Sequence, residues 1–177
     1  MSWEITEDEA RRLLGLPAGD RAVTFFQLVA DWEEAWGLQD ADGWVVGKAT
    51  DALPLWPHSD LAKACARGPW EGAAPVLISL DELVDDLLPV LEEDGLRVAV
   101  FPAPDDTGTF MTPADFRERL EAELSIGSER ESVDEFLRLM SERRATLEAA
   151  EVLLEDLPHQ VGRHLGRERP VRAGFPA

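Results

Sequence analysis

The sequence has a single cysteine, no tyrosine and no long apolar run among its 177 residues. Cys65 has no partner for an intramolecular disulfide bond, and such sparing use of cysteine is typical of a reducing compartment. There is also neither a signal peptide nor a run of about 18 apolar residues that would span a membrane. These absences predict a cytoplasmic protein.

Basic residues are scarce, with 17 Lys and Arg against 36 Asp and Glu, so the formal net charge is −19. From His159 onward four arginines face only Glu168, which leaves a net charge of −22 on residues 1–158. A field of this sign repels phosphate backbones and anionic lipid headgroups. We therefore expect no direct binding to nucleic acid or membranes, and we expect a basic protein as the partner.

Motifs that mark cofactor and metal sites are absent as well. The sequence contains no glycine-rich nucleotide loop, no Gly-x-Ser-x-Gly elbow and no Asp-x-Asp-x-Asp-Gly calcium loop. His159 and His164 have no cysteine beside them and cannot assemble a zinc site by themselves. The sequence thus predicts no cofactor, no metal and no catalytic residue. The clusters at 85–86, 92–94 and 105–106 are interpreted either as solvated helix ends and turns or as a surface for a basic protein.

Helix signals begin near the N-terminus. Thr6 with Glu9, and Ser79 with Glu82, have capping-box spacing. The sequence predicts a first helix that ends at Leu14, a second capped by Asp20, a third capped by Ser59 and ending at Gly68, and one that opens at Pro113. On the second helix, spacings of four, three and four predict one buried face. That face carries Phe25, Val29, Trp32 and Trp36.

Strand signals alternate with these helices. Asp42-Gly43 is typical of a β-hairpin turn, and the two prolines of residues 53–57 place that segment at a sheet edge. Further strands are predicted at 74–78, 96–101 and 107–111. The predicted fold class is α+β: an antiparallel or mixed sheet of four to five strands with helices mainly on one face, plus a long C-terminal helix.

The C-terminal part has a different pattern. Gly127-Ser128 marks a predicted boundary, so the expected parts are an α+β domain (1–126), a helix capped by Ser128 (127–158) and a flexible basic tail (159–177). The helix has a heptad-like apolar seam, which Arg143 interrupts. We expect it to dock on its own domain or to form a homodimer with a second chain. The seam comprises Val133, Phe136, Met140, Leu147, Ala150, Leu154 and Leu157.

Several short sequence motifs occur in an unusual order over residues 20–124. They are Phe25-Phe26, Trp36-Gly37-Leu38, Asp42-Gly43-Trp44, 53–57 with two prolines and Trp56, Ala62, Trp70, 78–82 and 98–102. In this order the chain resembles a bacterial family of unknown function, number 2750 in the domain-of-unknown-function series. The resemblance implies a small cytoplasmic α+β domain and supplies no activity, cofactor or catalytic residue.

Three tryptophans and one histidine are the candidate recognition residues: Trp44, Trp56, Trp70 and His58. Partly buried indoles offer an apolar wall and an N–H donor, but large aromatic residues also build cores. We expect a non-enzymatic adaptor or inhibitor-like module. One alternative is a small-molecule sensor with a Trp-lined pocket, which a deep apolar pocket would favour. Another is an enzyme that uses His58 with a nearby carboxylate. Cys65 is expected to be a buried structural residue.

Overall fold

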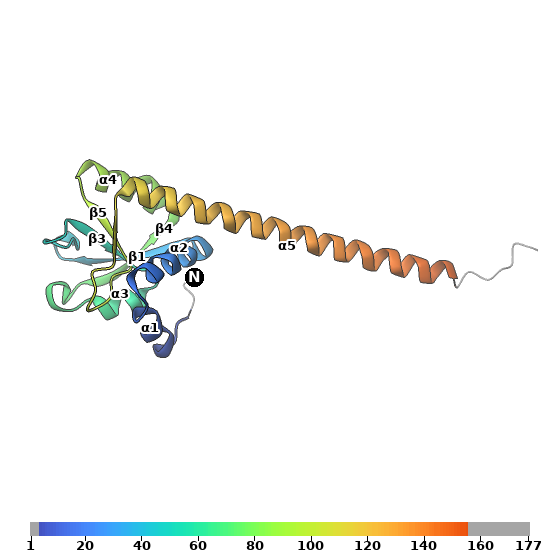
Figure 1. Ribbon diagram of the computed structural model, residues 1–177, viewed down its shortest axis with the longest axis horizontal. Helices are drawn as coiled ribbons and strands as arrows, with labels where there is room; N and C mark the ends of the chain where they lie inside the picture. Colours follow the sequence, from blue (N-terminus) through green and yellow to red (C-terminus); the bar gives the residue numbers. More distant parts are fainter. Residues whose placement is uncertain (1–3, 156–177) are drawn as a thin grey trace, which may run out of the picture. The chain divides into compact units, whose positions relative to one another are not determined.

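The structure is a computed structural model that describes residues 4–155, with side chains described up to residue 145. Its helices are α1 (Glu7–Leu14), α2 (Ala18–Trp32), α3 (Ser59–Cys65), α4 (Leu88–Glu93) and α5 (Pro113–Glu155), with a 3-10 turn η1 (Gly68–Trp70) and a π-helical segment η2 (Glu82–Leu87). Its strands are β1 (Glu34–Asp40), β2 (Gly43–Trp44), β3 (Ala52–Leu55), β4 (Ala74–Ser79), β5 (Arg97–Val100) and β6 (Thr109–Met111). These elements confirm the predicted α+β class (Figure 1).

The strands form two small sheets, ordered β2-β1-β4 and β3-β5-β6. Trp36 and Trp56 connect the sheets, because each backbone N–H donates to the other residue's carbonyl oxygen at 2.8 Å. β3 and β5 run parallel and the other pairs are antiparallel, so the pairing is mixed. The hairpin between β1 and β2 turns as predicted at Gly43, whose φ of 116° favours glycine.

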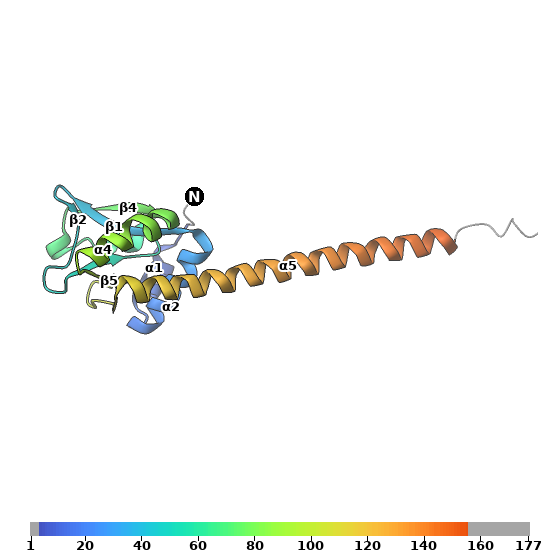
Figure 2. The same cartoon turned by 90° about the horizontal axis from the view of Figure 1, so that it is seen from above.

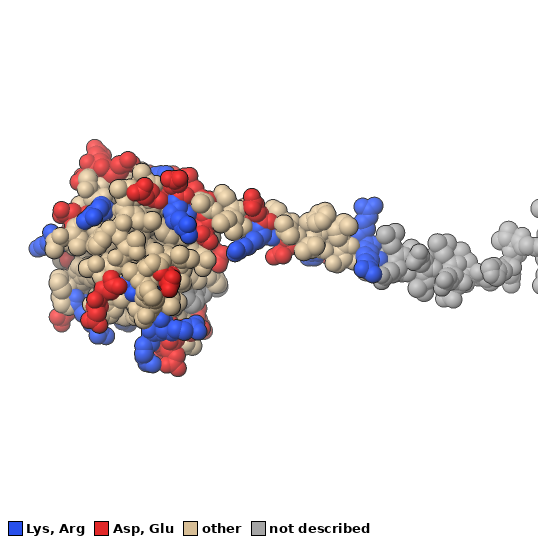
Figure 3. Space-filling model, in the orientation of Figure 1, with Lys and Arg blue, Asp and Glu red and all other residues tan. Residues whose placement is uncertain are grey.

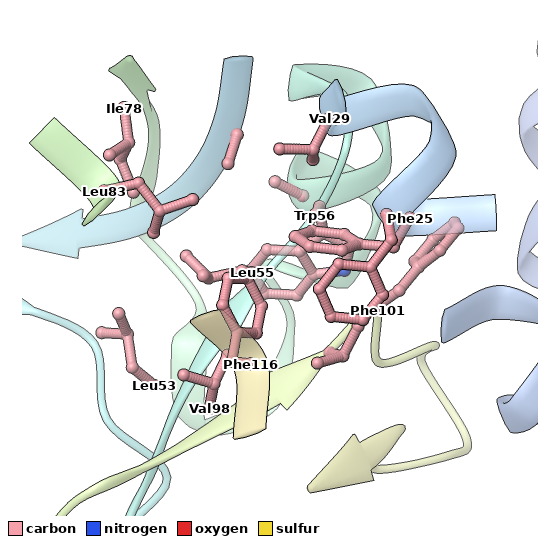
Figure 4. Packing of buried hydrophobic residues seen from close by; sticks show 14 of the residues in the cluster. Phe25, Val29, Leu53, Leu55, Trp56, Ile78, Leu83, Val98, Phe101 and Phe116 are labelled. Atoms are coloured by element: carbon pink, nitrogen blue, oxygen red, sulfur yellow. The ribbon is translucent and has the colours of Figure 1, made fainter. Parts of the chain in front are cut away.

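The core lies around β3 and β5. All four residues of β3 are buried, as are Val98, Ala99 and Val100 of β5, so these strands are covered on both faces. The covering side chains include Phe25 of α2 and Phe116 of α5, whose ring centroids are 5.8 Å apart. Figure 4 shows these rings packed around Trp56 and Phe101.

β4 is an outer strand of its sheet among the described residues. Along the antiparallel pair of β1 and β4, residue pairs that exchange hydrogen bonds alternate with pairs that do not. The alternation can be counted from the Leu80 N–H, which donates to the Glu33 carbonyl. Pro75, opposite Leu38, therefore falls at a position that needs no N–H toward β1. A proline here removes a donor from the exposed strand edge, which hinders pairing with another chain.

The predicted bounds of the second helix were wrong at both ends. α2 begins at Ala18 rather than after Asp20, and it ends at Trp32, where Glu33 adopts a left-handed φ of 56°. Trp36 consequently lies in β1 and leaves the helical face that spacing assigned to it. Trp32, the last residue of α2, is 44% exposed although it lies seven residues after Phe25 and nearly in phase with it.

Both capping boxes are confirmed. Glu9 accepts from the backbone N–H of Thr6, and Glu82 accepts from that of Ser79, both at 3.0 Å. After the second box the chain widens into the π-helical segment η2, where the N–H of Leu88 donates five residues back to Leu83. Pro89 follows in the first turn of α4 and has no N–H to donate, and the helical run continues through it without a break to Glu93.

α5 begins at Pro113 as predicted, and Phe116 and Leu120 are fully buried. Figures 1 and 2 show its first turns beside α4. The predicted break at Gly127-Ser128 was wrong, because α5 passes through both residues. One glycine costs a helix only about 1 kcal/mol, which good helix formers on both sides offset. The chain divides instead into residues 1–131 and 132–177. The predicted basic tail lies outside the described residues.

Candidate functional site

The polar group most deeply placed in the fold is Arg21, which sequence reasoning missed. Its side chain is almost fully buried, because it shares a helix face with Phe25 and Val29 at spacings of four. Nε donates to the carbonyl of Phe101 at 2.9 Å, and Nη1 donates to the carbonyl of Leu16. That spacing was the available signal, since a charged residue in phase with an apolar stripe has to find partners inside.

Arg21 also holds the loop that follows β5. Its Nη2 lies 2.9 Å from Oδ2 of Asp106, an ion pair that is close but not aligned as a straight hydrogen bond. Oδ1 of Asp106 accepts from the backbone N–H of Gly108 at 3.0 Å. This hydrogen bond, and then the neighbouring guanidinium of Arg21, lower the pKa of Asp106. The carboxylate therefore stays ionised and fastens the loop to α2.

The loop starts with a strained residue. Phe101 has a φ of 46°, which is unusual for a residue other than glycine. The next carbonyl, that of Pro102, accepts from Trp56 Nε1 at 2.9 Å and from Cys65 Sγ at 3.4 Å. Burial raises the pKa of the Cys65 thiol to about 11, so it stays protonated and is a poor nucleophile. Cys65, the last residue of α3, is buried as expected, and its thiol donates to this loop.

The candidate tryptophans do not form an exposed recognition surface. Trp56 is fully buried, and its ring packs edge-on against the half-buried Trp70 at 6.0 Å between centroids. Trp44 is half-buried in β2, and its ring covers Gly37 so closely that a Cβ there would lie 2.6 Å from it. Burial thus corrects the expectation for Trp56, because an enclosed ring cannot contact a partner.

His58 has a structural role in the loop between β3 and α3. It is buried, and its Nδ1 accepts the backbone N–H of Asp60 at 3.1 Å. His58 is therefore the N-cap of α3, which corrects the prediction for Ser59, and the helix ends at Cys65 rather than Gly68. Oδ2 of Asp60 is 3.9 Å from Nδ1. Since Nδ1 already accepts a backbone donor, this geometry does not favour a catalytic histidine–carboxylate pair.

An open groove of about 500 Å³ lies between α1 and α3. Its lining mixes apolar and charged side chains and contains none of the tryptophans, so it is not the Trp-lined pocket that a sensor would need. The residues that line it are Ile5, Thr6, Glu7, Ala10, Arg11, Leu14, Asp60, Ala64 and Arg67.

The strongest charge feature is an acidic segment that covers residues 81–94 of η2 and α4. Its seven carboxylates are all exposed, and the chain has no Lys or Arg between Arg67 and Arg97. None of the ion pairs found among the described side chains uses a carboxylate of this segment. Figure 3 shows acidic residues along the upper edge of residues 1–131, where Figure 1 labels α4. The seven residues are Asp81, Glu82, Asp85, Asp86, Glu92, Glu93 and Asp94.

The predicted seam falls on α5. Val133, Phe136 and Met140 are each more than half exposed. Leu147, Ala150 and Leu154 lie in the helix, beyond the last described side chain, and Leu157 lies outside the described residues.

Among the described side chains, which run to residue 145, the structure shows no group of three His, Cys, Asp or Glu that would hold a metal ion. None of the described helices is both long and apolar enough to cross a membrane.

Comparison with known proteins gives one match. A family model described as a protein of unknown function (DUF2750) matches residues 22–120, which is more than half of the chain. No curated protein and no solved structure matches the chain.

Proposed function

The chain belongs to the family of unknown function DUF2750, and from that premise we propose that it is a non-enzymatic, cytoplasmic interaction module that binds a basic partner protein. The proposed binding surface is the acidic segment of residues 81–94. The single cysteine supports the cytoplasm as the compartment, because small secreted domains commonly pair their cysteines in disulfide bonds.

One observation carries the proposal: the acidic segment concentrates seven exposed carboxylates with no basic residue among them. Arg117 reaches this segment from α5, but it donates to the Val84 backbone carbonyl at 2.6 Å rather than to one of the carboxylates. Several other arginines in residues 1–131 have acceptors outside the segment. Arg11 pairs with Asp8 at 2.8 Å, and Arg97 donates to the Thr50 carbonyl at 2.8 Å. The negative field of the acidic segment is therefore left to attract a cation-rich surface and to accelerate its association.

The rival functions have less support. A buried His58 that caps a helix is explained by the fold, and so is a protonated Cys65. The lining of the groove between α1 and α3 includes four charged residues and no aromatic residue. A surface of exposed carboxylates is the feature for which the packing of the domain gives no reason.

A matched pair of variants tests the proposal. The first removes four charges from the acidic segment: Asp85→Asn, Asp86→Asn, Glu92→Gln and Glu93→Gln. The control removes four exposed charges elsewhere in residues 1–131: Asp31→Asn, Glu33→Gln, Asp42→Asn and Asp51→Asn. Both variants have the same net charge, so any difference in binding reports position rather than total charge.

Binding is measured with a lysine-rich probe peptide and by capture of proteins from a lysate of the source organism. We expect the acidic-segment variant to bind about 10-fold more weakly than the control, and binding to weaken several-fold between about 50 and 300 mM salt. Equal losses in both variants, affinity that does not depend on salt, or tight binding to duplex DNA would contradict the proposal.

A further inference from the structure

Residues 133–140 of α5 have a complete division between apolar and polar positions. With Val133 at position a of a heptad, residues 133–140 place every apolar side chain at a, d, e or g and every charged side chain at b, c or f. The apolar residues are Val133, Phe136, Leu137, Leu139 and Met140. Such a division marks one face of a helix for burial.

That face is not buried in the described structure. Phe136 is 60% exposed, Leu137 55% and Leu139 52%. On the opposite face Glu135 and Arg138 form an ion pair at 3.0 Å, at positions c and f. Within residues 132–145, the polar face therefore has an ion pair of its own. The apolar side chains of the same segment remain exposed to water.

We propose that the apolar face of residues 133–140 binds the same face of a second copy of this chain. Heptad spacing is the pattern by which helices of equal repeat pack side by side, with a and d side chains filling holes in the facing helix. The sequence continues this spacing through Leu147, Ala150 and Leu154. A partner helix with the same repeat would match the face along its length, and a second copy supplies one.

Charge also favours a second copy at this place. Residues 132–145 contain three acidic residues and three arginines, so this segment is neutral and does not repel its own copy. The chain as a whole carries −19, and two copies that met through their acidic segments would repel each other. Self-association along this part of α5 therefore meets no net repulsion from the segment itself.

Exposed apolar residues of the first 131 residues offer no comparable stripe. Five of them come from four different elements. Val23 and Trp32 lie nine residues apart on α2, Leu77 lies in β4 and Val90 lies in α4. The fifth, Ile126, lies in α5 seven residues before Val133 and therefore shares its heptad position. The other four are single exposed apolar side chains, which are ordinary and do not form a docking face.

The mass of the full chain in solution tests the proposal. We would compare the wild type with Phe136→Glu and Met140→Glu, which put a charge at d or a, and with Ala145→Glu, which puts the same charge at the outer position f. Light scattering would follow each protein across concentrations from about 1 to 100 µM, a range that resolves dimers of moderate affinity.

The wild type and Ala145→Glu should have at least twice the 19.6 kDa mass of one chain. Phe136→Glu and Met140→Glu should raise the dissociation constant by about 100-fold or more, because burying an unpaired charge is unfavourable. Circular dichroism of each variant checks that residues 1–131 remain folded. A monomeric wild type would overturn the proposal, and so would seam variants that associate as tightly as Ala145→Glu.

Discussion

Trp56 and Phe136 are large aromatic side chains in the two parts of this chain, and they differ in their exposure to solvent. Trp56 is fully buried, its indole N–H donates to the Pro102 carbonyl, and its ring packs against Trp70. Phe136 is 60% exposed on a single helix. Residues 1–131 thus contain the partners for their own apolar side chains, whereas residues 132–145 have an apolar face that needs a partner. The first region explains the fold, and the second points to assembly.

The comparison is tested most strongly by removing the largest buried ring. Trp56→Ala should lower the free energy of unfolding by about 3–5 kcal/mol, because it opens a cavity and leaves the Pro102 carbonyl without its indole donor. Phe136→Ala is the matched change on the exposed helix and should leave the unfolding of residues 1–131 nearly unchanged. Urea denaturation followed by circular dichroism measures both. Equal losses in the two variants would remove the distinction between the regions.

Arg21 provides the second test, because it links α2 to the loop after β5. Arg21→Met should cost about 2–4 kcal/mol of stability, since the buried Phe101 carbonyl and the partly buried Leu16 carbonyl each lose a donor. Arg12→Met, which removes an exposed arginine from α1, is the control and should stay within about 0.5 kcal/mol of the wild type. A near-neutral Arg21→Met in thermal or urea unfolding would show that the loop does not depend on this anchor.

Replacing Arg143 should strengthen self-association, whereas the seam variants with glutamate weaken it. Arg143 occupies a d position, where a charge interrupts the seam. Arg143→Leu should therefore tighten self-association, with a dissociation constant about 10-fold lower. Arg138→Leu, at the outer position f, should give no such gain. Sedimentation of both variants decides this, and equal affinities would argue against the assigned heptad register.

Asp106 gives the smallest effect, and that effect depends on pH. Its pKa is lowered in the folded state, so its contribution is present above the ordinary aspartate pKa of about 4 and is lost as pH falls below it. Because the carboxylate is partly exposed, Asp106→Asn should cost less than about 1 kcal/mol at neutral pH. The gap between variant and wild type should close below about pH 4. A gap that persists in acid would assign the effect to something other than this ion pair.

The sequence was most informative where a local rule decides the structure. The capping boxes at Thr6 and Ser79 and the hairpin at Gly43 each follow from groups within a few residues of one another. The helical phase of Trp36 failed, because a left-handed Glu33 ended α2 before the pattern did. Gly127 failed as a break, because a single glycine does not outweigh a long run of helix formers.

The interior polar contacts could not be predicted in the same way. Arg21 and Phe101, which share a hydrogen bond, are 80 residues apart in the sequence. The N-cap of α3 is His58 rather than Ser59, because the His58 ring nitrogen accepts the Asp60 N–H. Such contacts depend on the tertiary arrangement of elements. The acidic segment, by contrast, was visible as composition, and the structure adds that its side chains are exposed and lie on η2 and α4.

We expect residues 1–131 to fold by themselves and residues 132–145 to be stabilised by a second copy of the chain. Hydrogen–deuterium exchange of the full chain at a high and a low protein concentration tests this difference directly. Amides of residues 132–145 should lose protection on dilution and in Phe136→Glu, while amides of β3 and β5 keep the same protection throughout. If the protection of residues 132–145 changes neither on dilution nor in Phe136→Glu, a second copy does not stabilise this segment.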